Sequence, residues 1–407
     1  MTDAGALRAL AATKLAEGRV PAAIRHARDY LQAVGAAAPV VAYPLIDPLQ
    51  AACAKDVSEI RVLQDADIAS LAHLTEGLQQ HVHWAAPFRP PALRVLAMRG
   101  AVALAPNLIL TADGKLLDDN IGFNNTELCD HMPADFNGIV AGGGRLLVAV
   151  RHRDVARVTE PALYLPAASN YAAWLFGSLP RLAACLEQND LPIVLHGDVA
   201  SYHLDSLHAM GIARERLHIH GAHVRIECKV LYYCTTSYFH HAPSATGVRH
   251  VRERVLTQLG LQANEPNGKG KRLYLARRHA KDRPLLNEAE VVALFERNGF
   301  TAIDPERHSF EEQVRFAAGA DILAGPYGAN LANMVFAGNA TENTHKLLIL
   351  GTKHQPEFAR LASTLGIPFW HTVPQGVEIR AGRTMSESFG YTADLGELEK
   401  VLRDCLA

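Results

Sequence analysis

The spacing of apolar positions divides the chain into three stretches of different character. The first 35 residues are rich in Ala and Leu at helical spacing, and Gly18 and Pro21 divide them into two predicted helices. Pro21 suits the first turn of the second helix because that turn needs no N–H from it. Residues 36–60 contain Pro and Ala without a regular period, and we interpret them as a linker. Residues 1–60 are therefore predicted to be a helical extension and linker.

The middle stretch mixes strand and helix signals. Two apolar runs flank Asp113-Gly114, which predicts a hairpin over 108–117. Helical spacing and short apolar runs predict the remaining elements. The predicted helices are 171–186, 202–210 and 248–259, and the predicted strands are 146–150, 193–195, 217–219 and 230–233.

The last stretch alternates regularly between strands and helices. Residues 261–271 are polar with Gly and Pro, and we interpret them as an interdomain linker. Gly299 is expected to end a helix over 288–298, and Ser309 with Glu312 forms a capping box that opens another. Predicted strands are 272–276, 301–303, 322–324 and 347–350. This alternation is typical of a parallel sheet with helices on both faces, so the chain is predicted to be α/β, with lobes over 61–262 and 263–407.

Composition narrows the function classes. The chain has 407 residues, 40 Lys plus Arg against 42 Asp plus Glu, and a net charge of -2. This balance gives no electrostatic case for nucleic-acid binding. Six cysteines form no C-x-x-C pair, and the N-terminus lacks the pattern of a signal peptide, so we expect reduced thiols and a cytoplasmic protein. The apolar run 33–46 is too short and too interrupted by proline to span a bilayer, which leaves only peripheral contact with the inner membrane face open.

Two features at predicted strand ends suggest a phosphorylated ligand. Arg277 follows the strand 272–276, and Arg283 lies six residues later. The loop 325–330, Gly-Pro-Tyr-Gly-Ala-Asn, follows the strand 322–324 and opens a helix. Ligands bind at the carboxyl ends of strands in open α/β sheets, where arginine and a helix N-terminus both favour phosphate. The loop is neither a Walker A motif nor the dinucleotide G-x-G-x-x-G.

Residues 273–337 resemble the C-terminal half of glycosyltransferase family 61, and the resemblance covers roughly 160–350. The positions that match are Arg277, Arg283, Asn287, Glu288, Gln313, Gly325, Gly328, Ala329, Leu331, Asn333 and Phe336. Upstream, Asn170-Tyr171-Ala172-Ala173-Trp174 and Leu179-Pro180-Arg181 are similar to a second family block. The chain departs from the family at Tyr327 and Ala173, where relatives have His, at Asn330, where they have Gly, and at Gly177, where an acidic residue is common.

The resemblance implies a GT-B-like fold of two Rossmann-like lobes and a hexosyl- or pentosyltransferase that uses a nucleotide sugar without an obligatory metal or other cofactor. The acceptor would be a glycan, a surface polysaccharide or a lipid-linked saccharide. The donor would lie on the C-terminal lobe. We assign to its site Arg277, Arg283, Tyr327, Gly328, Ala329, Asn330 and Asn333.

An inverting transfer needs a base that takes the proton of the acceptor hydroxyl. His196 and Asp198 follow the predicted strand 193–195 and are the first candidates. His240 and His241, before the helix 248–259, are a second pair, of which we select His241.

Other interpretations remain open. Changes at family positions make a non-catalytic nucleotide- or glycan-binding protein or scaffold the main alternative, and another phosphate-ligand enzyme, such as an epimerase, is a third. A homo-oligomer is neither predicted nor excluded. A zinc site is not expected, because the histidines at 218, 220 and 223 lack a cysteine pair or an H-E-x-x-H motif.

Overall fold

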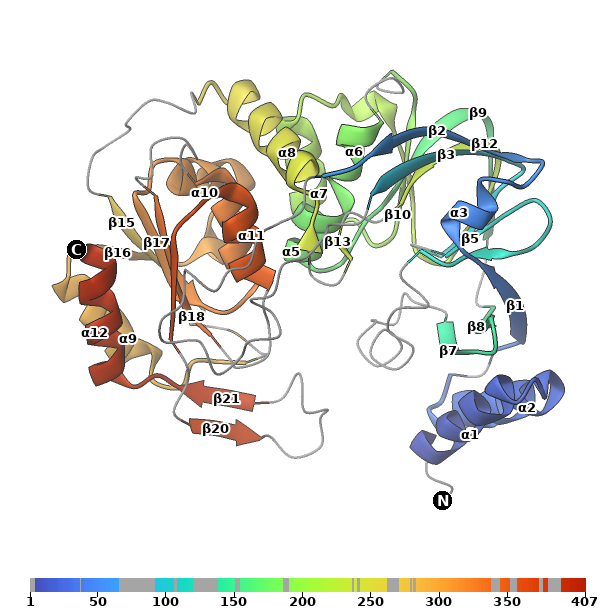
Figure 1. The fold of residues 1–407 in the computed structure, drawn as a ribbon, viewed down its shortest axis with the longest axis horizontal. Coiled ribbons are helices and arrows are strands. Elements are labelled where there is room, and N and C mark those ends of the chain that lie inside the picture. Colours follow the sequence, from blue (N-terminus) through green and yellow to red (C-terminus); the bar gives the residue numbers. More distant parts are fainter. Residues whose placement is uncertain are drawn as a thin grey trace.

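The fold is a mixed α/β structure built around two separate large sheets (Figure 1). The computed structural model describes residues 4–36, 38–65, 92–105, 108–119, 138–150, 154–185, 190–235, 238–239, 242–261, 271–278, 280, 283–337, 345–351, 357–372, 376–379 and 389–407. Residues 262–270 of the predicted linker 261–271 and the pair His240-His241 lie outside these residues. The mixed α/β class is confirmed, whereas the GT-B arrangement stays a prediction, as do the domain boundaries.

The N-terminal sheet has 12 strands in mixed orientation. Its order is β11-β10-β9-β12-β4-β5-β6-β1-β8-β7, with β3 on β12 and β2 on β3. The strands are β1 (Val40–Ile46), β2 (Val57–Leu63), β3 (Leu93–Arg99), β4 (Val102–Ala105), β5 (Leu108–Leu110), β6 (Leu116–Leu117), β7 (Gly138–Gly142), β8 (Arg145–Ala149), β9 (Asp154–Pro166), β10 (Ile193–His196), β11 (Leu217–His220) and β12 (Val224–Cys234). The strands β11-β10-β9-β12 form a continuous parallel run, and their order, 3-2-1-4 along the chain, is that of a doubly wound sheet. Elsewhere in this sheet, β1 also pairs in parallel with β6. The Rossmann-like character predicted for this lobe is therefore limited to four strands.

The N-terminal helices α1 (Ala4–Ala16) and α2 (Val20–Ala33) confirm the predicted pair, with proline in the first turn of α2. They pack on the end of the sheet formed by β1, β8 and β7 (Figure 1). The linker predicted over 36–60 is wrong, because it contains β1, β2 and the short helix α3 (Pro48–Ala51). The strand β1 pairs with β6 and with β8, about 70 and 100 residues later, so local spacing could not reveal these pairings.

The helix predicted over 171–186 is broken into three pieces. These are α5 (Tyr171–Ala173), a π-helical turn η3 (Trp174–Ser178) and α6 (Arg181–Ala184). Every residue from 174 to 185 is buried, so the segment has no polar face to mark its turns. The buried Arg181 holds the break, donating from Nε to the carbonyl of Gly177 and from Nη1 to that of Cys234 on β12.

The C-terminal sheet has five parallel strands in the order β16-β15-β17-β18-β19. The strands are β15 (Arg272–Leu275), β16 (Phe300–Ile303), β17 (Ile322–Pro326), β18 (Lys346–Leu350) and β19 (Phe369–Thr372). Alternate residues of each strand face two different cores: Leu273 and Leu275 face one, and Tyr274 and Ala276 face the other. The predicted parallel sheet of this lobe is confirmed, and its alternating burial reflects the helices on both faces.

Helices cover both faces of the five-stranded sheet (Figure 1). On the outer face lie α9 (Glu288–Arg297) and α12 (Leu395–Leu406). The inner face carries α10 (Phe310–Ala318), α11 (Glu357–Leu365) and η7 (Ala329–Phe336). The capping box of α10 and the left-handed Gly299 after α9 are confirmed. The helix expected after the glycine loop is instead the 3-10 helix η7.

The remaining elements are α7 (Ser201–Ala209), α8 (Ala245–Gln258), the short helices η5 (Arg214–Arg216) and η6 (Pro305–Arg307), and the strand pairs β13 (Tyr238–Phe239) with β14 (Ala242–Pro243) and β20 (Gly376–Ile379) with β21 (Phe389–Thr392).

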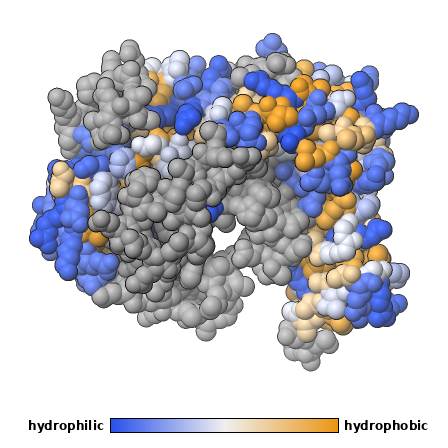
Figure 2. Space-filling model, viewed as in Figure 1, coloured by the Kyte–Doolittle hydropathy of each residue, from blue (hydrophilic) through white to orange (hydrophobic). Residues whose placement is uncertain are grey.

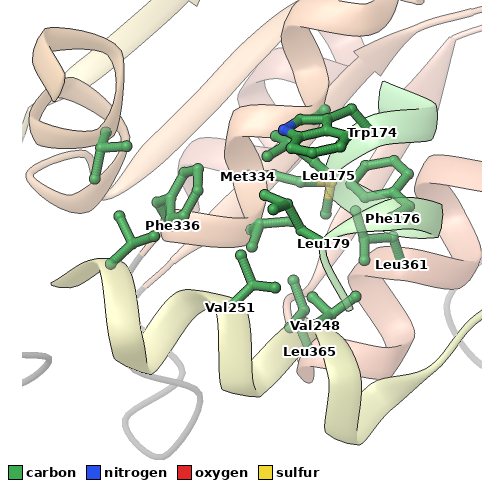
Figure 3. Packing of buried hydrophobic residues seen from close by; sticks show 14 of the residues in the cluster. Trp174, Leu175, Phe176, Leu179, Val248, Val251, Met334, Phe336, Leu361 and Leu365 are labelled. Carbon is green, nitrogen blue, oxygen red and sulfur yellow. The ribbon is translucent and has the colours of Figure 1, made fainter. Parts of the chain in front are cut away.

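One apolar core joins the two sheets. It contains side chains from η3 and α8 on the N-terminal side and from η7 and α11 on the C-terminal side (Figure 3). Phe176 of η3 and Phe358 of α11 meet edge to face, with ring centroids 6.0 Å apart. The two sheets are therefore joined by one continuous apolar core.

The surface of the molecule shown in Figure 2 carries apolar side chains over the N-terminal elements. Large hydrophobic residues that are exposed in this part include Leu10, Val34 and Val41. No helix among the described residues is long and apolar enough to cross a bilayer.

Candidate functional site

The candidate site lies where two neighbouring strands of the C-terminal sheet end. The strand β15 connects to β16 on one side, whereas β17 connects to β18 on the other. The chain therefore leaves β15 and β17 in opposite directions, which opens a crevice at their carboxyl ends, the usual ligand position in such sheets. Arg277 follows β15 and Tyr327 follows β17, so the two phosphate-binding features predicted from the sequence meet here.

Arg277 spans the crevice between the two strand ends. Its Nη1 donates to the carbonyl of Tyr327 over 2.7 Å, and its backbone N–H donates to Oε1 of Glu288 over 2.7 Å. Burial lowers the pKa of Arg277, and the neighbouring Arg283 lowers it further. Arginine side chains carry a positive charge in proteins. The strand end thus concentrates positive charge.

Gly328 lies directly against the guanidinium of Arg277. A Cβ built on Gly328 would come within 2.5 Å of both Cζ and Nε of Arg277. The backbone of Gly328 is extended, with φ of 175°, so this close approach, rather than unusual backbone, requires glycine.

Replacing Gly328 with alanine should therefore displace the Arg277 guanidinium and break its bond to Tyr327. The expected loss of nucleoside diphosphate affinity is about 10-fold, the size of one charge-assisted hydrogen bond. The free energy of unfolding should change little, because the displaced atoms are the end of a flexible side chain. Calorimetric titration and urea unfolding measure the two effects. Gly221→Ala is the control, because its Cβ would have no atom within 4 Å. Unchanged affinity in Gly328→Ala would show that this position of the guanidinium does not matter for binding.

Arg283 lies over the ring of Tyr327, with Cζ 5.5 Å from the ring centroid. Its φ of 50° is in the left-handed region, an unfavourable conformation for arginine. The Tyr327 ring is buried and also meets Phe358 edge to face at 4.9 Å. Tyr327 therefore supports Arg283 with its ring.

Glu288 is a buried carboxylate that the sequence analysis matched to the family without assigning to the site. Its Oε1 accepts from the backbone N–H of Arg277 and from the hydroxyl of Tyr274, 3.3 Å away. Burial raises the pKa of Glu288, and these two hydrogen bonds oppose the rise. Glu288 thus holds the backbone at the end of β15 and offsets part of the arginine charge. The signal that could have found it is an acidic residue in the first turn of a helix that follows Arg277.

The other predicted donor residues lie at the start of η7. Asn330 donates from Nδ2 to the carbonyl of Ala276, 3.2 Å away, which ties this turn to β15. Ala329 is half-buried beside it. Asn333 is only 2% exposed, and its side chain is bonded within the protein. The structure therefore brings Arg277, Arg283, Tyr327, Gly328, Ala329 and Asn330 together at the crevice, whereas Asn333 lies beneath it.

The N-terminal sheet presents the carboxyl ends of its parallel strands to the same region. The loop after β9 leads into α5, and α5 packs against η7. Asp198 follows β10, which is next to β9, and its side chain is exposed. An exposed carboxylate at this edge is accessible to an acceptor hydroxyl. Its role as base stays a prediction.

His196 is fully buried and lies on the other face of the sheet. Ile193 and Leu195 point into the core shared with the C-terminal sheet, whereas Val194 points into the opposite core. Because side chains alternate along a strand, His196 points the same way as Val194, and its Nδ1 lies 2.8 Å from the hydroxyl of Tyr164. This burial weighs against direct contact with an acceptor. His241, the third candidate base, lies outside the described residues.

A histidine that the sequence analysis did not select fixes the loop after β9. His203 accepts from the backbone N–H of Ala200 at Nδ1, so its Nε2 carries the proton that is donated to the carbonyl of Ala168. Burial lowers the pKa of His203 below its usual value. The folded protein therefore holds this histidine neutral.

Acidification should destabilise the protein through His203. The pKa of His203 in the folded protein is below its unfolded value of about 6.5. Above the unfolded value the free energy of unfolding keeps its full contribution from the neutral His203. This contribution is lost as pH falls through the folded pKa. Urea unfolding between pH 8 and pH 5 should give a falling midpoint for the parent protein and a smaller fall for His203→Gln. The control is His208→Gln, an exposed position on the same helix. Equal slopes for the parent and His203→Gln would contradict this assignment.

Within the residues that the structure describes, no group of three or more His, Cys, Asp or Glu side chains is arranged to hold a metal ion. His218 instead lies 3.9 Å from Glu160 at the edge of the sheet. Metal independence of the reaction stays a prediction.

Comparison with known proteins identifies the part of the chain that contains this site. No curated protein matches the chain significantly. Residues 171–344 match the model of the family described as Glycosyltransferase 61. The matched span begins at Tyr171 on the N-terminal side and includes Arg277, Arg283 and all of η7. The resemblance to glycosyltransferase family 61 found in the sequence is thereby confirmed for residues 171–344.

Proposed function

We propose that this protein transfers a sugar from a nucleotide-sugar donor to a glycan or surface-polysaccharide acceptor. The family implies glycosyltransferase activity, with a nucleotide-sugar donor and a glycan acceptor. The observation that carries the proposal for this chain is the position of Arg277 across the crevice between β15 and β17, against Gly328.

The chemistry of the donor explains why such a site suits it. When the sugar leaves, negative charge develops on the nucleoside diphosphate, and fixed positive groups stabilise that charge most effectively when they are preorganised. Arg277 is held by its bond to Tyr327, and Arg283 lies over the ring of the same residue. We propose that these two guanidinium groups bind the diphosphate and that no metal ion is required.

The acceptor would bind on the N-terminal side. Asp198 is the base that the geometry supports best, because it is exposed at the strand ends facing α5, whereas His196 is buried. A base on the opposite side from the departing diphosphate is what an inverting transfer requires. The location in the cytoplasm, with peripheral contact to the inner membrane face, remains part of the proposal.

A second function, binding of a nucleotide or glycan without catalysis, is favoured by one observation. Where the family has histidine in the glycine loop, the Tyr327 ring is buried against Phe358 and supports Arg283. At two further family positions, Ala173 and Gly177 offer no ionisable side chain. Such a protein would keep the donor site and lack the acid–base chemistry.

A thermal-shift screen against nucleoside diphosphates and nucleotide sugars tests the proposal. A ligand at about 100 times its dissociation constant adds ~2.7 kcal/mol of stability. We expect one nucleotide to raise the melting temperature, and the matching nucleotide sugar to release its diphosphate slowly. Binding without release, with acceptor saccharides present, would favour the non-catalytic function. No shift with any nucleotide would contradict the donor site.

A further inference from the structure

The observation that leads beyond the proposed function is a chain of hydrogen bonds between the two sheets. The hydroxyl of Tyr171, on α5, donates to Oδ1 of Asn333 over 2.7 Å. Asn333, on η7, donates from Nδ2 to Oε1 of Gln313 on α10 over 2.9 Å. Gln313 donates from Nε2 to the carbonyl of His308 over 3.0 Å. The chain thus runs from the acceptor side, through the helix that follows the glycine loop, to the C-terminal lobe.

The direction of every bond in this chain is fixed. The Nδ2 of Asn333 also lies 3.1 Å from the carbonyl of Asn330, and a carbonyl can only accept. The Nε2 of Gln313 faces the carbonyl of His308 for the same reason. Neither amide can turn over without placing two acceptors together, so the Tyr171 hydroxyl must be the donor. A chain with one allowed direction specifies one arrangement of its three side chains.

The shared apolar core cannot by itself determine this arrangement of side chains. Apolar contacts are non-directional, and they fix the distance between the lobes more strongly than the register of one helix on another. The Asn333 side chain is buried beneath the loop that carries Gly328 and Ala329. Its bond to the Asn330 carbonyl holds the first turn of η7, the turn that also contacts the end of β15 through Asn330.

We infer that Asn333 is a positioning residue and that Tyr171 sets the donor loop from the acceptor-side lobe. The inference rests on the proposed donor site for its functional meaning. In this role Asn333 acts on the donor through the backbone of residues 328–330 and does not contact the donor itself.

Hydrogen exchange of the amides in residues 329–336 tests this inference without any ligand. Tyr171→Phe removes one hydroxyl and keeps the ring, and we expect about 3- to 10-fold faster exchange there, the size of one neutral hydrogen bond. Tyr202→Phe is the matched control. Its hydroxyl donates to the carbonyls of Ala168 and Ser169, and its ring lies 5.4 Å from that of Tyr171, but its bonds stay within the N-terminal lobe. Exchange in 329–336 should be unchanged in this control.

A second variant separates positioning from mere filling of space. Asn333→Asp has the same shape, but it places an oxygen against Oε1 of Gln313 and the carbonyl of Asn330. A buried carboxylate also lowers the stability of the whole protein by itself, so only a rise in exchange that is larger in 329–336 than elsewhere indicates positioning. If Asn333 positions the loop, exchange in 329–336 rises and the affinity for the nucleoside diphosphate selected in the screen falls. Tyr171→Phe should lower the same affinity.

The outcomes distinguish the two proposals. Unchanged exchange in both Tyr171→Phe and Asn333→Asp, or an equal rise in Tyr202→Phe, would overturn the positioning role. If no nucleoside diphosphate binds the parent protein, the donor site fails, while the exchange comparison still decides whether Tyr171 sets the loop. Faster exchange with unchanged diphosphate affinity would overturn the link between this loop and the donor site.

Discussion

Replacing Arg277 with alanine should weaken nucleoside diphosphate binding by about 1.5–3 kcal/mol, the scale of a hydrogen bond to a charged group. This corresponds to about 10- to 150-fold in the dissociation constant. The reason is geometric as well as electrostatic, because the bond to the Tyr327 carbonyl holds the Arg277 guanidinium in the crevice. Arg277→Lys should recover only part of the loss, since an ammonium group cannot reproduce the planar fork. Calorimetric titration measures both variants.

The control for this experiment is the neighbouring arginine. Arg278 is exposed, carries the same charge and follows Arg277 in the chain. Arg278→Ala should therefore retain most of the affinity if the site depends on the crevice and not on net charge. Equal losses in Arg277→Ala and Arg278→Ala would show a diffuse electrostatic effect and would contradict the assigned site.

Replacing Phe176 with alanine should destabilise the whole protein by about 3–5 kcal/mol, the usual cost of removing a buried phenylalanine. Phe176 has no exposed surface and contacts Phe358 on the other side of the shared core. Because that core contains residues of both lobes, we expect a single unfolding transition whose midpoint falls as one unit. Urea unfolding followed by circular dichroism and by tryptophan fluorescence reports on the two lobes together.

Phe295→Ala is the matched comparison, because Phe295 is equally buried but lies in the outer core of the C-terminal sheet, between Tyr274 and Phe300. Both variants should lower the same transition if the lobes unfold together. Two separate transitions, with Phe295→Ala affecting only one of them, would contradict a shared core that couples the lobes.

The sequence by itself determined the C-terminal lobe closely. Short apolar strands alternated there with capped amphipathic helices, and local signals such as Gly299 and the Ser309–Glu312 box marked their ends. It also predicted that Arg277 and the glycine loop follow strands of one parallel sheet, whose carboxyl ends share an edge. The structure added that β15 and β17 are direct neighbours. These features depend on interactions within a few residues, which is why their spacing is visible along the chain.

Only the tertiary structure decided the N-terminal lobe and the roles of single side chains. The strand β1 pairs with β8 far along the chain, and the segment 174–185 is buried on all sides, so neither leaves a local period. His196 is buried away from the crevice because its side chain lies on the face of β10 that is turned away from the other lobe. Likewise, Asn333 belongs to the glycine-loop motif in the sequence, but its bond to Tyr171 comes from 162 residues away. Contacts between distant segments are set by packing of the whole molecule, and they determine which residues of a motif face a ligand and which hold the motif in place.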